Sequence, residues 1–263
     1  MSQDPYQSTP DTSFVNDDGH GGAPLRSRPW QAMTSTLQSE AWGQNVLWLS
    51  IAALLNGIFV GQIGLLGWGT DVIRARAGLP GNKTPDLNPD RLGDYMQNGI
   101  WPFLVALIMQ FILGIISIIP GFMFMGSILA MSGAGETASA MTALVGAPFL
   151  ILAVVALSSF VVPFVLNAMI SQDFSKAMDF GWAFHFLSIM FFEILWSGFV
   201  YYFLAVCVTL VGFLALCVGI FPAQGIIYGG TMNLLSQWYE IFLSRGGRPI
   251  ALPKDVLVQA EVI

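Results

Sequence analysis

Long apolar segments alternate with shorter polar ones along most of the chain. A helix needs about 20 apolar residues to cross the roughly 30 Å hydrocarbon layer of a bilayer. Segments near or above this length occupy residues 46–68, 101–129, 143–169, 194–220 and 222–243. The pattern therefore predicts an all-α fold, an integral membrane helical bundle with about five transmembrane helices and additional interfacial helices.

One apolar stretch, residues 182–221, is too long for a single span and too short for two spans joined by a turn. We expect residues 183–193 to lie along the membrane interface as an elbow, which keeps the carboxylate of Glu193 at the depth of the lipid headgroups. Apolar residues at helical spacing within 30–42 predict a second interfacial helix before the first span.

The chain divides into three parts by composition. Residues 1–29 are rich in small polar residues, Gly and Pro. They contain too little apolar surface to fold, so we predict a disordered N-terminal tail. Residues 30–248 form the predicted polytopic transmembrane domain, and residues 249–263 form a C-terminal tail.

Lys and Arg indicate the orientation of the spans. They are found in the segments 69–100 and 170–185 and in the C-terminal tail, which the positive-inside rule places in the cytoplasm. The side of the N-terminus stays open, because segment 46–68 either spans once or enters the membrane and returns with a break near Asn56. We favour one continuous helix, since this segment is short for a hairpin across the bilayer.

Composition narrows the class of protein further. Hydrophobic residues make up 55% of the chain and charged residues 10%, with a net charge of -6, whereas soluble domains contain about 25% charged residues. These values favour the lipid bilayer as a partner, with other membrane proteins or a second copy of the chain as further candidates, and argue against nucleic acid. No metalloprotease, CxxC, phosphate-loop or nucleophile-elbow motif is present, so we predict no catalytic residue, metal or cofactor and a protein that is not an enzyme.

Small residues repeat at helical spacing in several of the apolar segments. Their lack of side-chain bulk lets helix backbones approach closely, and this packing replaces the hydrophobic driving force that lipid does not supply. We expect these positions to hold the chain's own bundle together rather than to form a dimer interface. The predicted helix-packing residues are Gly57, Gly61, Gly64, Gly114, Gly121, Gly225 and Gly229.

Charged residues gather in the predicted cytoplasmic segment after the first span. Asp71, Arg74, Arg91 and Asp94 are candidates for a surface that docks a soluble partner or anionic lipid headgroups. We prefer the simpler interpretation that they form a solvated rim with a few ion pairs.

Several short motifs follow one another in a recognisable order. They are the segments 69–74 (GTDVIR), 92–99 (LGDYMQNG) and 174–180 (FSKAMDF), and Pro222 at the start of the last helix. Through their order and spacing, residues 40–248 resemble the prokaryotic membrane family numbered 4013 among the domains of unknown function. The resemblance implies a multi-pass protein of a prokaryotic cytoplasmic (plasma) membrane with no assigned activity.

The function expected from these observations is that of a non-enzymatic scaffold, assembly factor or accessory subunit. The alternative is a small-solute transporter or channel-like carrier. Four neutral amides within the predicted spans distinguish the two: Asn56, Gln110, Asn167 and Asn233. A water-filled cavity lined by these side chains would favour transport, and their burial in helix contacts would favour a scaffold.

Overall fold

The computed structural model describes residues 26–55, 59–76, 85–132, 155–214 and 219–251. Every regular element assigned within these ranges is a helix, so the prediction of an all-α fold is confirmed. In chain order they are α1 (Pro29–Thr34), the 3-10 helix η1 (Ser35–Leu37), α2 (Trp42–Leu54), α3 (Val60–Arg76), the 3-10 helix η3 (Pro89–Arg91), α4 (Leu92–Ser132), an unlabelled helix Val155–Ser171, α6 (Phe174–Ala177), α7 (Phe180–Leu214) and α8 (Ile220–Ser244).

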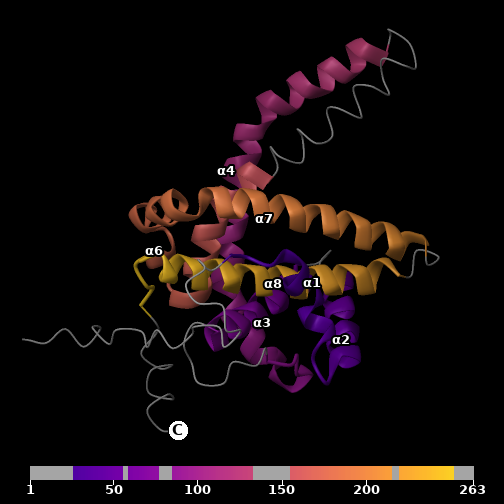
Figure 1. The fold of residues 1–263 in the computed structure, drawn as a ribbon, viewed down its shortest axis with the longest axis vertical. Coiled ribbons are helices and arrows are strands. Elements are labelled where there is room, and N and C mark those ends of the chain that lie inside the picture. The colour runs from indigo at the N-terminus through magenta and orange to yellow at the C-terminus, as the bar shows by residue number, and fades with distance from the viewer. Residues whose placement is uncertain (1–25, 56–58, 77–84, 133–154, 215–218, 252–263) are drawn as a thin grey trace, which may run out of the picture.

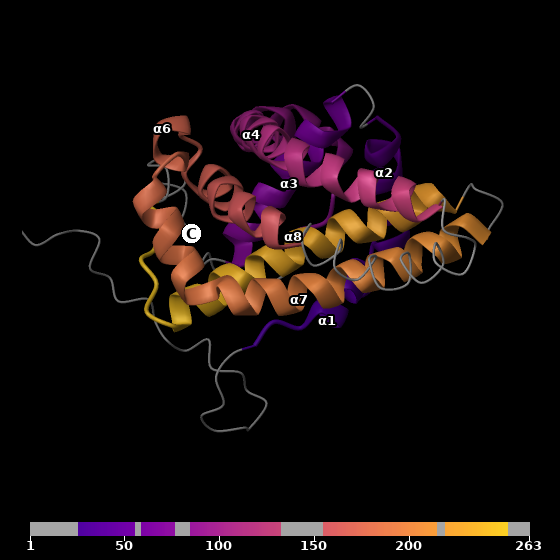
Figure 2. The same ribbon diagram turned by 90° about the horizontal axis from the view of Figure 1, so that it is seen from above.

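Helix α8 lies at the centre of the fold, in contact with α1, α2, α3 and α7 (Figures 1 and 2). About half of its 25 residues are buried. Near its C-terminal end, Phe242 packs against Trp182 and Phe186 of α7, with ring centroids 5.6 and 4.8 Å away. The core is therefore built around the last helix of the chain.

Helices α3 and α4 form the second closely packed pair. Trp68 of α3 and Tyr95 of α4 are both about 2% exposed. The indole N–H of Trp68 donates to the Pro85 carbonyl at 3.1 Å, and the backbone N–H of Asn88 donates to the Tyr95 hydroxyl at 3.3 Å. These bonds attach the end of the connection between α3 and η3 to the helix pair.

Segment 46–68 is not the single continuous helix that we favoured. Helix α2 ends at Leu54 and α3 begins at Val60. Phe59, directly before α3, has a φ of 62°, a left-handed conformation that cannot continue a right-handed helix. The break is close to Asn56. The alternative prediction, a segment that enters the membrane and returns, requires a break at this position.

Residues 183–193, the predicted elbow, belong to α7, which is helical from Phe180 to Leu214. Figure 2 shows the first turns of α7 running at an angle to the long part that lies beside α8. Trp182, Phe186, Met190 and Ile194 are buried at four-residue spacing, so one face of the helix is covered through this region. The location of these residues at a membrane interface stays a prediction.

Two helices in the described ranges are long and apolar enough to cross a membrane, Pro89–Ile116 and Phe180–Leu214. The helix Val155–Ser171 is apolar but shorter, and residues 143–154 of its predicted span lie outside the described residues. Helix α4 runs across the direction of α7 and α8 in both views, rather than beside them (Figures 1 and 2). The described residues thus confirm the helical fold but not the predicted bundle of about five transmembrane helices.

Candidate functional site

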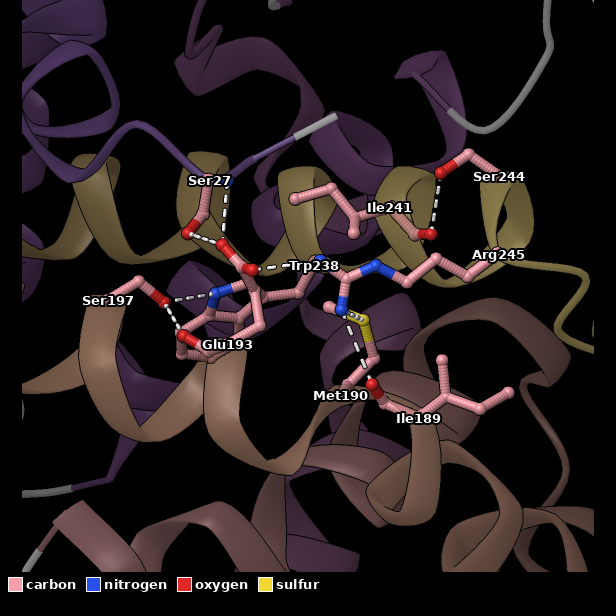
Figure 3. Close-up of polar contacts among 9 residues, drawn as sticks. All are labelled: Ser27, Ile189, Met190, Glu193, Ser197, Trp238, Ile241, Ser244 and Arg245. Carbon is pink, nitrogen blue, oxygen red and sulfur yellow. Dashed lines mark hydrogen bonds and ion pairs between the residues drawn. The ribbon is translucent and has the colours of Figure 1, made fainter. Parts of the chain in front are cut away.

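Glu193, a half-buried carboxylate on α7, joins three distant parts of the chain (Figure 3). Its Oε1 accepts hydrogen bonds from the backbone N–H of Ser27 at 3.0 Å and from the Ser27 hydroxyl at 2.6 Å. Its Oε2 lies 2.9 Å from Nη2 of Arg245. Since Ser27 precedes α1 and Arg245 follows α8, one carboxylate holds both of these segments beside α7.

A second layer of hydrogen bonds supports this carboxylate (Figure 3). The Ser197 hydroxyl donates to the Glu193 carbonyl and accepts a bond from the indole N–H of Trp238 at 2.9 Å. Nη1 of Arg245 donates to the Ile189 carbonyl at 3.3 Å. Ser197 is almost fully buried, so these bonds are shielded from solvent and fix α7 against α8.

The sequence prediction for Glu193 missed this site. It assigned the carboxylate to headgroup depth without a partner in the protein, whereas both of its oxygens bind other residues, Oε1 to Ser27 and Oε2 to Arg245. It also placed residues 26–29 in the N-terminal tail, but Ser27 contacts α7 and the backbone N–H of Arg28 donates to Gln237 on α8 at 2.8 Å. The sequence around Glu193 contains no signal for either partner, since Arg245 and Ser27 are 52 and 166 residues away along the chain.

Three of the four predicted docking residues meet around one guanidinium. Nη2 of Arg91 lies 3.0 Å from Asp71, and its Nε lies 3.5 Å from Asp94. The guanidinium carbon of Arg91 also lies 5.4 Å from the centre of the Tyr95 ring. Arg74 is buried and donates to the Ile170 carbonyl at 3.2 Å.

Among the charged residues around Arg91, Asp71 has a pKa that its buried surroundings shift upward. Burial raises the pKa of the Asp71 carboxyl above its ordinary value, and the positive charges of Arg91 and Arg74 only partly offset the rise. Its ion pair with Arg91 connects α3 to η3. The arrangement joins two elements of the fold.

Asp86 makes a third polar connection, between the segment before η3 and the N-terminal helices. Its carboxylate accepts hydrogen bonds from the Ser39 hydroxyl and from the Asn45 side chain, the latter at 2.8 Å. The Asn45 carbonyl oxygen accepts from the Leu87 backbone N–H at 2.9 Å. The bonds from Ser39 and Asn45 lower the pKa of Asp86 below its ordinary value.

Three of the predicted helix-packing glycines face another element at short range. A Cβ at Gly225 would lie 3.1 Å from Leu49 of α2, and one at Gly229 would lie 2.2 Å from the Thr36 hydroxyl of η1. A Cβ at Gly64 would lie 3.9 Å from its nearest neighbours. Gly225 and Gly229 thus form a surface of α8 on which the N-terminal elements sit.

The other predicted glycines give less information about packing. Gly61 is buried, and no described atom lies within 4 Å of a Cβ built at Gly114. Gly57 lies outside the described residues, and Gly121 lies in the part of α4 where the structure describes the backbone alone.

The tightest glycine contacts involve two positions that the small-residue pattern did not select. A Cβ at Gly67 would lie 1.8 Å from the Tyr95 carbonyl oxygen, and one at Gly99 would lie 1.8 Å from the Ile63 carbonyl oxygen. Each helix of the α3–α4 pair therefore contributes one glycine that faces the backbone of the other. Only a residue without a side chain allows this approach.

The family model described as protein of unknown function (DUF4013) matches residues 50–221, more than half of the chain. The chain belongs to this family. The resemblance predicted from the short motifs is thereby confirmed. No curated protein and no solved structure matches the chain.

The DUF4013 region contains residues of both the Arg91 cluster and the Glu193 site. Asp71, Arg91 and Asp94 all lie inside it, as does Glu193. Ser27 and Arg245, which hold the Glu193 carboxylate, lie outside it. The site in Figure 3 therefore combines one residue of the DUF4013 region with segments on both sides of it.

The predicted amides are not equivalent in this DUF4013 protein. Asn233 is fully buried and donates to the Gly229 carbonyl of its own helix at 3.0 Å. Asn167 is buried and donates to the Lys176 carbonyl at 2.9 Å. Gln110 is exposed on α4, and Asn56 lies outside the described residues.

The described ranges contain no group of three or more His, Cys, Asp or Glu side chains that could hold a metal ion. The carboxylates described above are used in hydrogen bonds and ion pairs within the protein. These bonds join helices and chain segments that are distant in the sequence.

Proposed function

We propose that this DUF4013 protein is a multi-pass integral protein of a prokaryotic cytoplasmic membrane that acts without catalysis, as a scaffold, assembly factor or accessory subunit. The observation that carries this proposal is the exposure of large apolar side chains along α4 and α7. Phe111 on α4 is 72% exposed, and Phe192 and Leu214 on α7 are each 81% exposed.

This exposure supports a lipid environment for physical reasons. The core helix of a soluble protein buries its apolar face, and soluble monomers rarely expose apolar patches larger than a few hundred Å². Here the two most apolar long helices have many of their large side chains uncovered, including Ile115 and Ile116 on α4 and Phe203 and Leu210 on α7. Lipid chains would cover these surfaces.

The use of polar groups supports a structural role. The side chains of Asn167 and Asn233 donate to backbone carbonyls, and Glu193 is engaged by an ion pair and two hydrogen bonds. A solute carrier would need the amides to line one water-filled path, whereas Gln110 is exposed on α4 and Asn233 is enclosed in the core. These observations favour the scaffold over the transporter.

The contacts of Glu193 also bear on topology. Residues 26–28 and Arg245 meet at the same carboxylate, so they lie on the same side of any membrane that the protein crosses. If the C-terminus is cytoplasmic, as the distribution of Lys and Arg predicts, the N-terminus is cytoplasmic too. The break between α2 and α3 agrees with this topology. A segment that enters the membrane and returns to the same side leaves the orientation of all later spans unchanged.

Membrane insertion is tested first by extraction of native membranes at alkaline pH. The protein should stay in the pellet and be released by detergent alone. Release by carbonate would contradict insertion and leave a peripheral or soluble protein with an uncovered apolar surface.

Topology is tested by labelling single cysteines in a variant without Cys207 and Cys217. A cysteine at Ser132, at the end of α4, should be labelled from the opposite side to one at Ser175, which is exposed on α6. A cysteine at Ser8 should share the side of Ser175. Labelling of Ser132 and Ser175 from one side would rule out the proposed crossing between them.

The scaffold itself is tested by purification from native membranes in mild detergent. We expect a second membrane protein, or further copies of this chain, to co-purify in fixed stoichiometry. A protein that is always isolated as a monomer without partners, and that transports a solute after reconstitution, would establish the carrier instead.

A further inference from the structure

The arginines on both sides of the Glu193 site form a basic surface, which we call the arginine cluster: Arg26, Arg28, Arg245 and Arg248. We infer that the arginine cluster binds the phosphate of an anionic phospholipid headgroup. This inference rests on the membrane location proposed above and assigns a ligand to one edge of the protein.

The Glu193 carboxylate brings the arginine cluster together from opposite ends of the described chain. Arg26 and Arg28 flank Ser27, which is bonded to Oε1, and Arg245 is paired with Oε2 (Figure 3). Arg248 follows on the same segment, where its carbonyl accepts a bond from the indole N–H of Trp182 at 2.9 Å. The segments that carry the four arginines are thus held against α7 and α8 by hydrogen bonds and one ion pair.

Three of the four arginines in the cluster form no ion pair with another described residue. Glu193 neutralises Arg245. Within the described residues, no ion pair is formed by Arg26, Arg28 or Arg248, and the Arg28 guanidinium contacts the neutral side chain of Gln31 at 3.4 Å. All four arginines are exposed, although the whole chain has a net charge of -6. A local basic surface on an acidic protein favours an anionic partner.

Exposed aromatic rings beside the cluster favour a lipid over a soluble anion. Trp30, two residues after Arg28, is 63% exposed, and Trp196, one helical turn after Glu193, is 70% exposed. Trp side chains concentrate at the headgroup level of membranes, and arginine binds phosphate through paired N–H donors. A bilayer surface supplies both the anion and the amphipathic layer that the rings require.

The test measures the thermal unfolding of the full chain in detergent while phosphatidylglycerol is added. A ligand that binds only the folded state raises the unfolding midpoint with concentration, which gives its affinity. Phosphatidylglycerol should raise the midpoint, whereas phosphatidylcholine and inorganic phosphate should not. Each arginine near an anionic surface contributes about a fivefold change in affinity, so the double variant Arg26→Gln/Arg28→Gln should bind roughly 25-fold more weakly. Both substitutions retain the backbone bonds of Ser27 and Arg28.

The matched control is Lys83→Gln/Lys176→Gln, which removes the same charge elsewhere and should respond to phosphatidylglycerol like the wild type. Equal weakening in both double variants would overturn the inference, and so would an unchanged affinity in the arginine variant. A polyglutamate peptide that reproduces the rise would also overturn it, by identifying a protein-binding surface. A chain that stays in solution without detergent contradicts the proposed function, whereas a detergent-dependent chain without a phosphatidylglycerol response contradicts this site alone.

Discussion

Gly67 is the position where the structure makes its sharpest prediction about stability. An alanine methyl there would lie 1.8 Å from the Tyr95 carbonyl oxygen, although real Cβ atoms do not come closer than 3.0 Å to such a neighbour. The oxygen belongs to the backbone of α4, so α3 and α4 must separate by more than about 1 Å. Overpacking of this kind costs about 1–3 kcal/mol or more, and the better helix propensity of alanine offsets only about 1 kcal/mol.

Gly64→Ala is the matched control for Gly67→Ala, because it lies one turn earlier on α3 and faces the same helix. Its added methyl would lie 3.9 Å from Leu92 and Met96, an ordinary contact. Both variants gain the same helix propensity, so the difference in their unfolding midpoints in detergent measures the steric conflict. For a chain of this size, 1 kcal/mol corresponds to about 2–4 °C. A Gly67→Ala protein that melts at or above Gly64→Ala would show that the two helices do not cross here.

Two further predictions concern polar contacts. The pKa of Asp86 is lowered by its hydrogen bonds, so its contribution to stability is present above the ordinary pKa and is lost as the pH falls through the lowered value. Asp86→Asn should therefore reduce the loss of melting temperature between neutral and acidic pH, and an unchanged profile would contradict this assignment. Ser197→Ala removes the acceptor of the buried Trp238 indole and should cost about 1–3 kcal/mol in the same melts. Exposed Ser188 bonds to its own helix, so Ser188→Ala should have little effect, and equal losses would argue against a special role for Ser197.

Long apolar runs correctly predicted those helices that continue without a break. Segment 101–129 lies within α4 and segment 222–243 lies within α8. The pattern failed at 46–68, because apolar composition does not report the backbone conformation that ends a helix. The alternative of a break near Asn56 identified the right position, since the left-handed Phe59 follows Asn56 closely.

The small-residue pattern could identify close helix packing but not the partner of each glycine. It searches for repeats within one helix, and Gly225 with Gly229 is such a repeat. Gly67 and Gly99 belong to different helices, and each matters because of a backbone carbonyl on the other. A contact of this kind depends on the crossing point of α3 and α4, which spacing along one segment does not contain.

The Glu193 site was beyond prediction for a related reason. A single carboxylate in an apolar run is costly in lipid unless it reaches the surface or finds a partner. We predicted a surface position because the apolar run of residues 182–221 is too long for one span and too short for two. The partner Arg245 is 52 residues away and Ser27 is 166 residues away, and folding alone brings them to α7.

These long-range contacts show that the DUF4013 region is not a complete structural unit in this protein. The match ends at residue 221, just after α8 begins, yet α8 is the helix against which α1, α2, α3 and α7 all pack. The Glu193 carboxylate then attaches both flanking segments to α7. Since the flanking segments supply the central helix and the partners of a half-buried charge, the fold of the family region depends on residues beyond its boundaries. The exposed surface of the protein is accordingly a property of the whole assembly of helices, including those outside the DUF4013 match.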